Sequence, residues 1–226
     1  DSYFQVTIPE DGEYVIAVTD HLGRGGADFV YRVELSPVKP SLTVGIPRVQ
    51  RYGQYRQQIY VPRGNRFATV MTVTRNNVSG PVVFEPGELP AGVTMVTEEM
   101  PDSMNVMPVV FEAAADAPLS GKLVDFRARH ADPNAKIDGG FYNRAEFVIA
   151  APGQTLYRWR DVTRLPIAVV DELPFHLEIV QPKVPLVRNG SMNLKIVAHR
   201  KEGFTAPISV LFPFSPPGVG AARSVT

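Results

Sequence analysis

The sequence contains no cysteine, which excludes disulfide bonds, thiolate nucleophiles and cysteine-ligated zinc sites. It also has no excess of charge of either sign, because 23 lysine and arginine residues balance 23 aspartate and glutamate residues. Proteins that hold nucleic acid or an anionic membrane through bulk charge need a basic excess. We therefore expect no nucleic acid among the partners of this chain.

Long hydrophobic runs are missing as well. No apolar run approaches the ~18 residues of a membrane-spanning helix, so we expect no membrane insertion. No stretch of twelve or more residues repeats its apolar positions at a helical period. The opening residues, DSYFQVTIPEDGEYVIAV, resemble the interior of a β domain rather than a secretion signal. We therefore expect the chain to be a piece of a longer protein.

The sequence is rich in proline and glycine, and apolar residues alternate with polar ones in several segments. It contains 21 prolines and 18 glycines, which suit turns and strand edges and disfavour long helices. Apolar residues alternate with polar ones in segments 29–35, 67–73, 123–129, 175–179 and 192–198. A strand with one apolar and one charged face is typical of antiparallel sheets. The sequence therefore predicts an all-β protein, antiparallel throughout, with helix limited to single turns.

One sequence pattern occurs twice. YVPRGNRFATVMTVTRNNVSGPVVFEPGELPAGVTM returns as LVRNGSMNLKIVAHRKEGFTAPISVLFPFSPPGVGA. Four pairs of residues lie 126 positions apart: Gly64 and Gly190, Pro81 and Pro207, Pro90 and Pro216, and Gly92 and Gly218. Upstream, Pro40 and Pro174 lie 134 positions apart, so the first copy holds eight additional residues, within RVQRYGQYRQQ. A period of this length indicates tandem domains, because the repeats of solenoids are far shorter.

Both copies end in a turn of the form Pro-x-Gly-Val. Gly92 and Gly218 are predicted to adopt positive φ in type II-like turns, because glycine has no steric penalty there. Two modules are therefore expected, one starting near Pro40 and the other near Pro174.

Segment 11–40, DGEYVIAVTDHLGRGGADFVYRVELSPVKP, resembles the last strands of a bacterial pre-peptidase C-terminal (PPC) domain, a β-sandwich of large secreted proteins. The stretches GPVVFEPGELPAGVT and APISVLFPFSPPGVG resemble the immunoglobulin-like domains that follow it in such proteins. The resemblance implies tandem antiparallel β-sandwich (immunoglobulin-like) modules, incomplete at both ends. Residues 1–37 would be the last strands of a PPC-like β-sandwich, 38–171 a complete immunoglobulin-like β-sandwich, and 172–226 the first part of a second module. The resemblance brings no catalytic residues.

Nucleophilic hydrolysis lacks its usual signatures in this sequence. There is no Gly-x-Ser-x-Gly elbow and no grouping of serine, histidine and aspartate. The four histidines are scattered, at His21, His130, His176 and His199, and the last two are predicted on outward strand faces. We therefore predict no catalytic residues and no enzymatic activity for this chain.

Two loops carry acidic residues that suit calcium. Asp20 and Asp28 flank the glycine-rich loop DHLGRGGAD, and HADPNAKIDGG offers Asp132, Asn134 and Asp138. Calcium takes about six to eight oxygen ligands, and neither loop has the full acidic spacing of an EF-hand. The same residue types also serve ordinary hairpin turns. Calcium is thus the one cofactor that the sequence suggests, with a plain turn as the alternative at each loop.

The stretch RVQRYGQYRQQIYVPRGNR combines arginine and tyrosine without an acid. Its central residues Arg51, Tyr52, Tyr55 and Arg56 could hold a polyanion or a sugar by charge and stacking. The stretch coincides with the additional residues of the first copy, and insertions often carry a module's specific function. The alternative is a solvated loop whose arginines guard an edge strand against pairing.

The only tryptophan, Trp159, lies between two arginines in LYRWRDVTR. It is either a packing residue of a linker or an exposed interaction residue.

These features favour a non-enzymatic structural or adhesive segment of a secreted multidomain bacterial surface protein, acting through contacts with other polypeptide. Two alternatives stay open. One is an accessory region of a secreted hydrolase whose catalytic domain lies outside this chain. The other is a carbohydrate-binding module that holds polysaccharide with the arginine/tyrosine stretch. The expected location is extracellular, at the cell surface or in the periplasm.

Overall fold

The computed structural model describes residues 3–48, 56–149 and 156–221. Two compact units divide the chain, Asp1–Pro37 and Val38–Thr226, and each is treated by itself. The protein is all-β, as the alternation predicted: among the described residues the only helical element is the 3₁₀ turn Pro133–Ala135. No helix in these residues is long and apolar enough to span a membrane.

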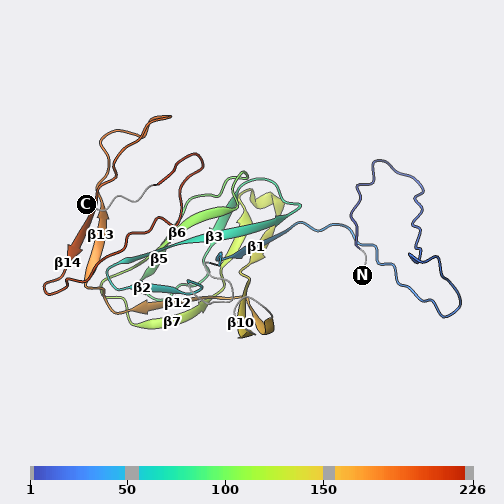
Figure 1. Ribbon diagram of the computed structural model, residues 1–226, viewed down its shortest axis with the longest axis horizontal. Helices are drawn as coiled ribbons and strands as arrows, with labels where there is room; N and C mark the ends of the chain where they lie inside the picture. Colours follow the sequence, from blue (N-terminus) through green and yellow to red (C-terminus); the bar gives the residue numbers. More distant parts are fainter. Residues whose placement is uncertain (1–2, 49–55, 150–155, 222–226) are drawn as a thin grey trace. The chain divides into compact units, whose positions relative to one another are not determined.

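One layer of the second unit is a four-stranded antiparallel sheet (Figure 1). Its strands, in spatial order, are β1 (Ser41–Gly45), β3 (Arg66–Asn76), β6 (Val106–Ala113) and β5 (Val93–Val96). The alternation in β3 places Thr69, Met71 and Val73 in the core as predicted, with exposed fractions of 8%, 0% and 3%.

Two three-stranded sheets pack with this sheet around the core of the second unit. The first has the order β2 (Ile59–Pro62), β12 (Leu165–Val170) and β7 (Ser120–Val124), and the second has the order β4 (Val82–Glu85), β8 (Arg127–His130) and β9 (Asp138–Gly140). Side chains from all three sheets meet in one core, in which Phe111 and Phe126 are the largest fully buried residues. Full burial of such a ring stabilises the fold by roughly 1.5–3 kcal/mol. We call residues 38–170 without the β10–β11 hairpin the β body.

The prediction of antiparallel pairing throughout is wrong for β2 and for the isolated parallel bridge between Val44 and Phe141. β2 pairs in parallel with β12, with Ile59 opposite Ile167 and Pro62 opposite Val170. After β1 the chain leaves the four-stranded sheet, and β2 joins another sheet beside β12, the last strand of the β body. Alternation could not reveal this pairing, because side chains alternate in the same way in parallel and antiparallel strands.

Alternation over 123–129 predicts a single strand, whereas the structure has two. β7 ends at Val124, and β8 begins at Arg127 in a different sheet. The Phe126 amide donates to the Val124 carbonyl at 3.0 Å, so the chain turns a corner between sheets. The predicted inward face survives the corner, because Val124, Phe126 and Ala128 are all buried.

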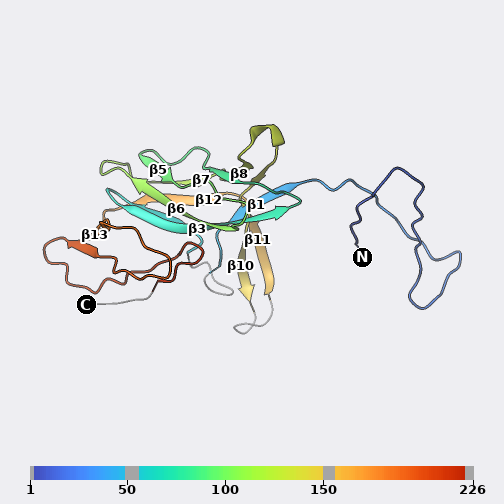
Figure 2. The ribbon, with the colours of Figure 1, turned by 90° about the horizontal axis from the view of Figure 1, so that it is seen from above.

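β10 (Asn143–Ile149) and β11 (Leu156–Val162) form an antiparallel hairpin that pairs with no other described strand. Figures 1 and 2 show this hairpin standing off the β body. Its residues Phe147, Val148 and Trp159 are 68%, 49% and 45% exposed. The hairpin therefore presents apolar side chains to solvent instead of adding them to the core.

β13 (Phe175–Ile179) and β14 (Ile196–Arg200) form a second isolated antiparallel pair. Phe175 lies opposite Arg200, and Ile179 lies opposite Ile196. β3 carries β6 on its other edge, whereas β14 has no second neighbour among the described strands. That this pair belongs to a second copy of the module stays a prediction.

Gly92 and Gly218 occupy equivalent turns, with φ angles of 77° and 81° as predicted. In each turn the amide after the glycine donates to the carbonyl of the proline two residues before it, at 3.1 Å in the first copy and 3.0 Å in the second. Gly64 and Gly190 are not equivalent in this way. Gly64 has a φ of 65°, but in the second copy Asn189 takes the positive φ, at 59°. Asparagine tolerates this conformation, so the turn is shifted by one residue.

Residues 3–37 of the first unit contain turns and no assigned strand. The alternating segment 29–35, expected above to be a strand, is exposed on both faces, with Val30 and Tyr31 at 92% and 73%. A strand is stable only when neighbouring strands receive its backbone hydrogen bonds, and this segment has no such neighbour among the described residues. The expected strands over 1–37 are not formed here, and the assignment of this part to a β-sandwich stays a prediction.

Candidate binding site on the β10–β11 hairpin

The hairpin carries an ordered network around the only tryptophan. The guanidinium carbon of Arg144 lies 5.0 Å from the ring centroid of Trp159, within the range of a cation–π interaction. Arg144 Nε lies 3.8 Å from Asp161 Oδ1, and Tyr142 donates its hydroxyl to the same oxygen at 2.8 Å. The predicted interaction residue Trp159 is therefore exposed and also held by a neighbour.

The register of the hairpin explains why these side chains meet. Arg144 lies opposite Asp161, and Glu146 lies opposite Trp159. Residues two apart in a strand share a face, so Arg144 and Trp159 are diagonal neighbours. Arg160 falls on the other face, where it has no hydrogen bond or ion pair with any described residue.

Two residues of the arginine/tyrosine stretch contact the base of this hairpin. The first residue of the stretch, Arg48, pairs with the Glu146 carboxylate and donates to the Arg144 carbonyl oxygen at 2.6 Å. Further along the stretch, Gln57, which is buried, hydrogen-bonds to the Asn143 side chain. The sequence offered the stretch and the tryptophan as separate candidates, whereas the structure brings these two residues of the stretch to the hairpin that bears the tryptophan.

The predicted binding residues Arg51, Tyr52 and Tyr55 lie outside the described residues, so their role stays a prediction. Arg56 is described and has a φ of 60°. The Glu146 side chain is only 5% exposed, and its Oε2 atom has no hydrogen-bond partner. A buried carboxylate needs a compensating cation, so Arg48 is fixed beside it at the start of the stretch.

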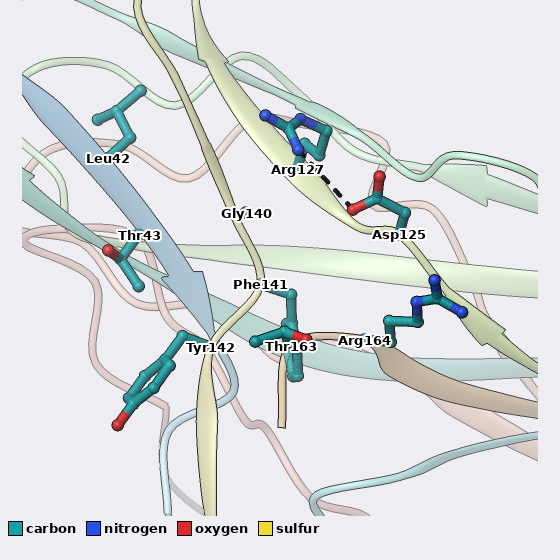
Figure 3. A pocket seen from close by; sticks show the side chains of 9 residues that line it. All are labelled: Leu42, Thr43, Asp125, Arg127, Gly140, Phe141, Tyr142, Thr163 and Arg164. Carbon is teal, nitrogen blue, oxygen red and sulfur yellow. Dashed lines mark ion pairs between the residues drawn. The ribbon is translucent and has the colours of Figure 1, made fainter. Parts of the chain in front are cut away.

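A cleft of about 610 Å³ opens at the base of the hairpin (Figure 3). The polar residues around it are Thr43, Asp125, Arg127, Tyr142, Thr163 and Arg164. Figure 3 shows the chain from Gly140 to Tyr142 crossing the cleft, with Thr43 on one side and Arg127 on the other. Because Tyr142 also belongs to the tryptophan network, the cleft and the network are continuous.

Of the two arginines that line the cleft, one has ion-pair partners. Arg127 pairs with Asp138 and lies 3.9 Å from Asp125, which also lines the cleft (Figure 3). The hydrogen bond to Asp138 raises the pKa of Arg127 above its ordinary value. Arg164, in contrast, forms no hydrogen bond or ion pair with any described residue. The hydroxyls of Thr43 and Thr163 also have no partner in the described part of the chain. Three donor groups therefore line the cleft without protein partners.

The first predicted calcium loop forms a turn. The Asp20 carboxylate accepts the amides of Leu22 at 3.0 Å and Arg24 at 3.2 Å. The Arg24 side chain also pairs with it, and this hydrogen bond lowers the pKa of Asp20 below its ordinary value. Asp28 belongs to a separate turn over residues 26–29. The Asp20 carboxylate is thus occupied by donors of its own loop.

The second predicted calcium loop is a turn as well. Asp132 caps the 3₁₀ turn by accepting the Asn134 amide at 2.9 Å, and Asp138 pairs with Arg127. Over residues 3–48, 56–149 and 156–221, no group of three or more histidine, aspartate or glutamate side chains is placed to hold a metal ion. Both loops form turns in this structure, and calcium binding at either loop stays a prediction.

Three of the four histidines contact a carboxylate, the backbone or each other. His199 hydrogen-bonds to Glu178 at 2.7 Å and stacks on His176 with 4.5 Å between ring centroids. His130 lies 3.0 Å from the backbone oxygen of Ser79. Among the described residues, no side-chain hydroxyl hydrogen-bonds to a histidine ring, although such a bond is what activates a serine or threonine nucleophile.

Sequence reasoning missed Tyr142, Arg144 and Arg164. They come from the two ends of a hairpin and from the turn after it, so no single motif contains them. One signal was present: Tyr142 and Arg144 are two positions apart and therefore share a face if the segment is a strand. The pairing with Asp161 depends on the hairpin register, which the sequence alone does not specify.

Comparison with known proteins adds no relative. No family model matches the sequence, and neither a curated protein nor a solved structure matches it. The resemblance to a PPC domain followed by immunoglobulin-like modules stays a prediction, and function has to be argued from the geometry above.

Proposed function

We propose that this chain is a non-enzymatic structural or adhesive segment of a secreted bacterial surface protein, and that it contacts other polypeptides through the β10–β11 hairpin. The observation that carries this proposal is a hairpin that stands off the β body and exposes Phe147, Val148 and Trp159. The β body serves as the scaffold that fixes the base of the hairpin. The surface context rests on the resemblance of the sequence to modules of such proteins.

The chemistry of the hairpin suits a polypeptide partner. Binding surfaces on proteins are enriched in aromatic residues and arginine. Trp159 is already oriented by Arg144 at 5.0 Å, so less side-chain freedom is lost on binding. Arg160 on the opposite face has no partner among the described residues and remains able to donate to carboxylates or carbonyls of the partner.

We also propose that the β body and the β13–β14 pair belong to two consecutive immunoglobulin-like β-sandwich modules. Leu177 and Ile179 of β13 are 41% and 53% exposed, whereas Leu42 and Val44 of β1 are 4% and 0% exposed. An apolar face of this kind is stable when a further layer covers it. Polypeptide that completes the second module would bury these side chains.

Site-specific cross-linking tests the contact proposal. A photo-reactive benzoylphenylalanine placed at Phe147 should cross-link a discrete polypeptide from the secreted fraction of the producing cells. The same group at Val96, which is 54% exposed on β5, is the matched control and should not. Trp159→Ala should then weaken binding of that purified partner by about tenfold or more. Equal cross-linking from both positions, or an unchanged affinity of Trp159→Ala, would contradict the proposal.

A further inference from the structure

We propose that the cleft at the base of the hairpin binds one anionic sugar unit of an acidic polysaccharide, with Arg164 receiving the acidic group. This site adjoins the polypeptide contact proposed above through Tyr142 but does not depend on it. It also differs from the arginine/tyrosine stretch in which the sequence placed a polysaccharide, because none of the residues used here belongs to that stretch.

Charge determines which group the cleft can accept. Arg127 already pairs with Asp138 and lies 3.9 Å from Asp125, so Arg164 is the cation of the cleft that has no acidic partner among the described residues. A guanidinium offers paired N–H donors that match the two oxygens of a carboxylate or sulfate. One free guanidinium corresponds to one negative charge, which is the charge that a single uronate or sulfated sugar carries.

The remaining polar groups suit the hydroxyls of a sugar. Thr43 and Thr163 bring hydroxyls that have no protein partner in the described chain, and Asp125 brings a carboxylate. Hydroxyls both donate and accept, and a carboxylate accepts, so the set can hydrogen-bond to several sugar hydroxyls. Tyr142 adds a ring that is 40% exposed, and the bond from its hydroxyl to Asp161 fixes the orientation of the ring.

The floor of the cleft is a glycine. A Cβ built at Gly140 would meet no atom within 4 Å, so the space above this residue is open. The cleft volume of about 610 Å³ falls within the roughly 300–1,000 Å³ of small-molecule sites. Because glycine has no side chain and the space beside Gly140 is open, a sugar ring can lie against the backbone there.

An acidic polysaccharide explains the cleft better than a nucleic acid does. Nucleic-acid sites neutralise several phosphates at once, whereas the cleft has a single free cation and the whole chain has no net charge. A polysaccharide with one charge on each sugar unit needs only one arginine at each subsite. Hydroxyl-rich surroundings also match a sugar more closely than a phosphate.

Isothermal titration calorimetry with defined oligomers tests this site. The probes are a galacturonate hexamer, a sulfated hexasaccharide, neutral cellohexaose and a single-stranded oligothymidylate. We expect the carboxylated or the sulfated oligomer to bind with a Kd on the order of 0.1–1 mM, and the difference between these two identifies the acidic group. The neutral oligomer should bind at least about tenfold more weakly, because it leaves Arg164 unpaired.

Three variants localise the binding. Arg164→Ala should weaken binding of the acidic oligomer by about tenfold or more, and Gly140→Leu should abolish it by filling the cleft. Arg188→Ala removes an exposed arginine that belongs neither to the cleft nor to the hairpin and should leave the affinity within about twofold. Thermal unfolding confirms that each variant is folded. Absence of binding by both acidic oligomers, equal losses for Arg164→Ala and Arg188→Ala, or tighter binding of oligothymidylate would overturn the proposal.

Discussion

Gly139 and its neighbour Gly140 are adjacent residues with opposite surroundings. A Cβ at Gly139 would lie 1.7 Å from the carbonyl oxygen of Leu42, whereas a Cβ at Gly140 would meet nothing within 4 Å. We expect Gly139→Ala to lower the free energy of unfolding by about 3 kcal/mol or more, because the backbone of β1 would have to move. Gly140→Ala should change it by less than about 1 kcal/mol. Urea denaturation of both variants measures the difference, and equal stabilities would refute the packing of β9 against β1.

The ionisation of Asp20 gives a second test on the scale of a residue. The hydrogen bond from Arg24 lowers the pKa of Asp20 below its ordinary value of 3.8. A lowered pKa in the folded turn means that the ionised carboxylate stabilises this turn above about pH 4. That contribution is lost as the pH falls through the lowered pKa. NMR titration should show the pKa of Asp20 rising toward 3.8 in Arg24→Ala, and an unchanged pKa would exclude the Arg24 contact.

Trp159 illustrates what the sequence can and cannot predict about a single residue. Its position between two arginines left open whether it packs in a linker or stays exposed. The structure places it on a free-standing hairpin at 45% exposure, against Arg144. Arg144 lies 15 positions earlier in the chain, and only the hairpin register brings the two together. The sequence shows Arg158 and Arg160 beside Trp159, but it does not predict that Arg144 is the arginine that contacts the ring.

At the scale of an element, alternation predicted strands well where at least one neighbouring strand is present, as in β3, β7 and β13. β3 follows the predicted inward face, and so do the buried residues on either side of the β7–β8 corner. Alternation says nothing about partners, which is why the parallel pairing of β2 with β12 and the corner itself were missed. It also failed for 29–35, because an apolar face alone does not form a strand without a neighbour.

Hydrogen exchange should separate the elements by their number of neighbours. Amides of β3 and β6 lie in the middle of the four-stranded sheet over a buried core, so we expect slow exchange for peptides covering 66–76 and 106–113. Peptides covering 175–200 should exchange at least about a hundredfold faster, because β13 and β14 pair only with each other among the described strands and isolated pairs are marginal. Segment 3–37 should exchange fastest. Strong protection of 175–200 in the isolated chain would mean that this pair is covered within the chain.

At the scale of the whole molecule, the described residues form one well-packed core and three poorly covered parts. Among the described residues, the fully buried large side chains all belong to the β body. The hairpin, the β13–β14 pair and residues 3–37 instead have large apolar side chains that are exposed. Exposed apolar residues in such number suit a molecule that works by contact with others. The sequence predicted the module plan from the repeat, but it could not show which surfaces remain uncovered.

Enzymatic assays test the prediction that this chain has no hydrolytic activity. We predict no hydrolytic turnover of protein, peptide or glycoside substrates by this chain. The reason is that no nucleophile, base and orienting group come together among the described residues. The measurement is substrate cleavage by the purified chain, with a heat-treated sample as control. Turnover that survives purification and is abolished by a point substitution in this chain would show that it is an enzyme.

The central claim is that contacts are made by the hairpin while the β body serves as its scaffold. Replacing residues 145–160 with Asn-Gly joins Arg144 directly to Asp161, which already lie opposite each other, through a two-residue turn. The decisive measurement is the affinity of this variant for the polypeptide that cross-links at position 147 of the original chain. We predict that the variant keeps the unfolding temperature of the β body within a few degrees and loses at least about a hundredfold in affinity. A folded variant that binds the same partner with unchanged affinity would contradict the claim.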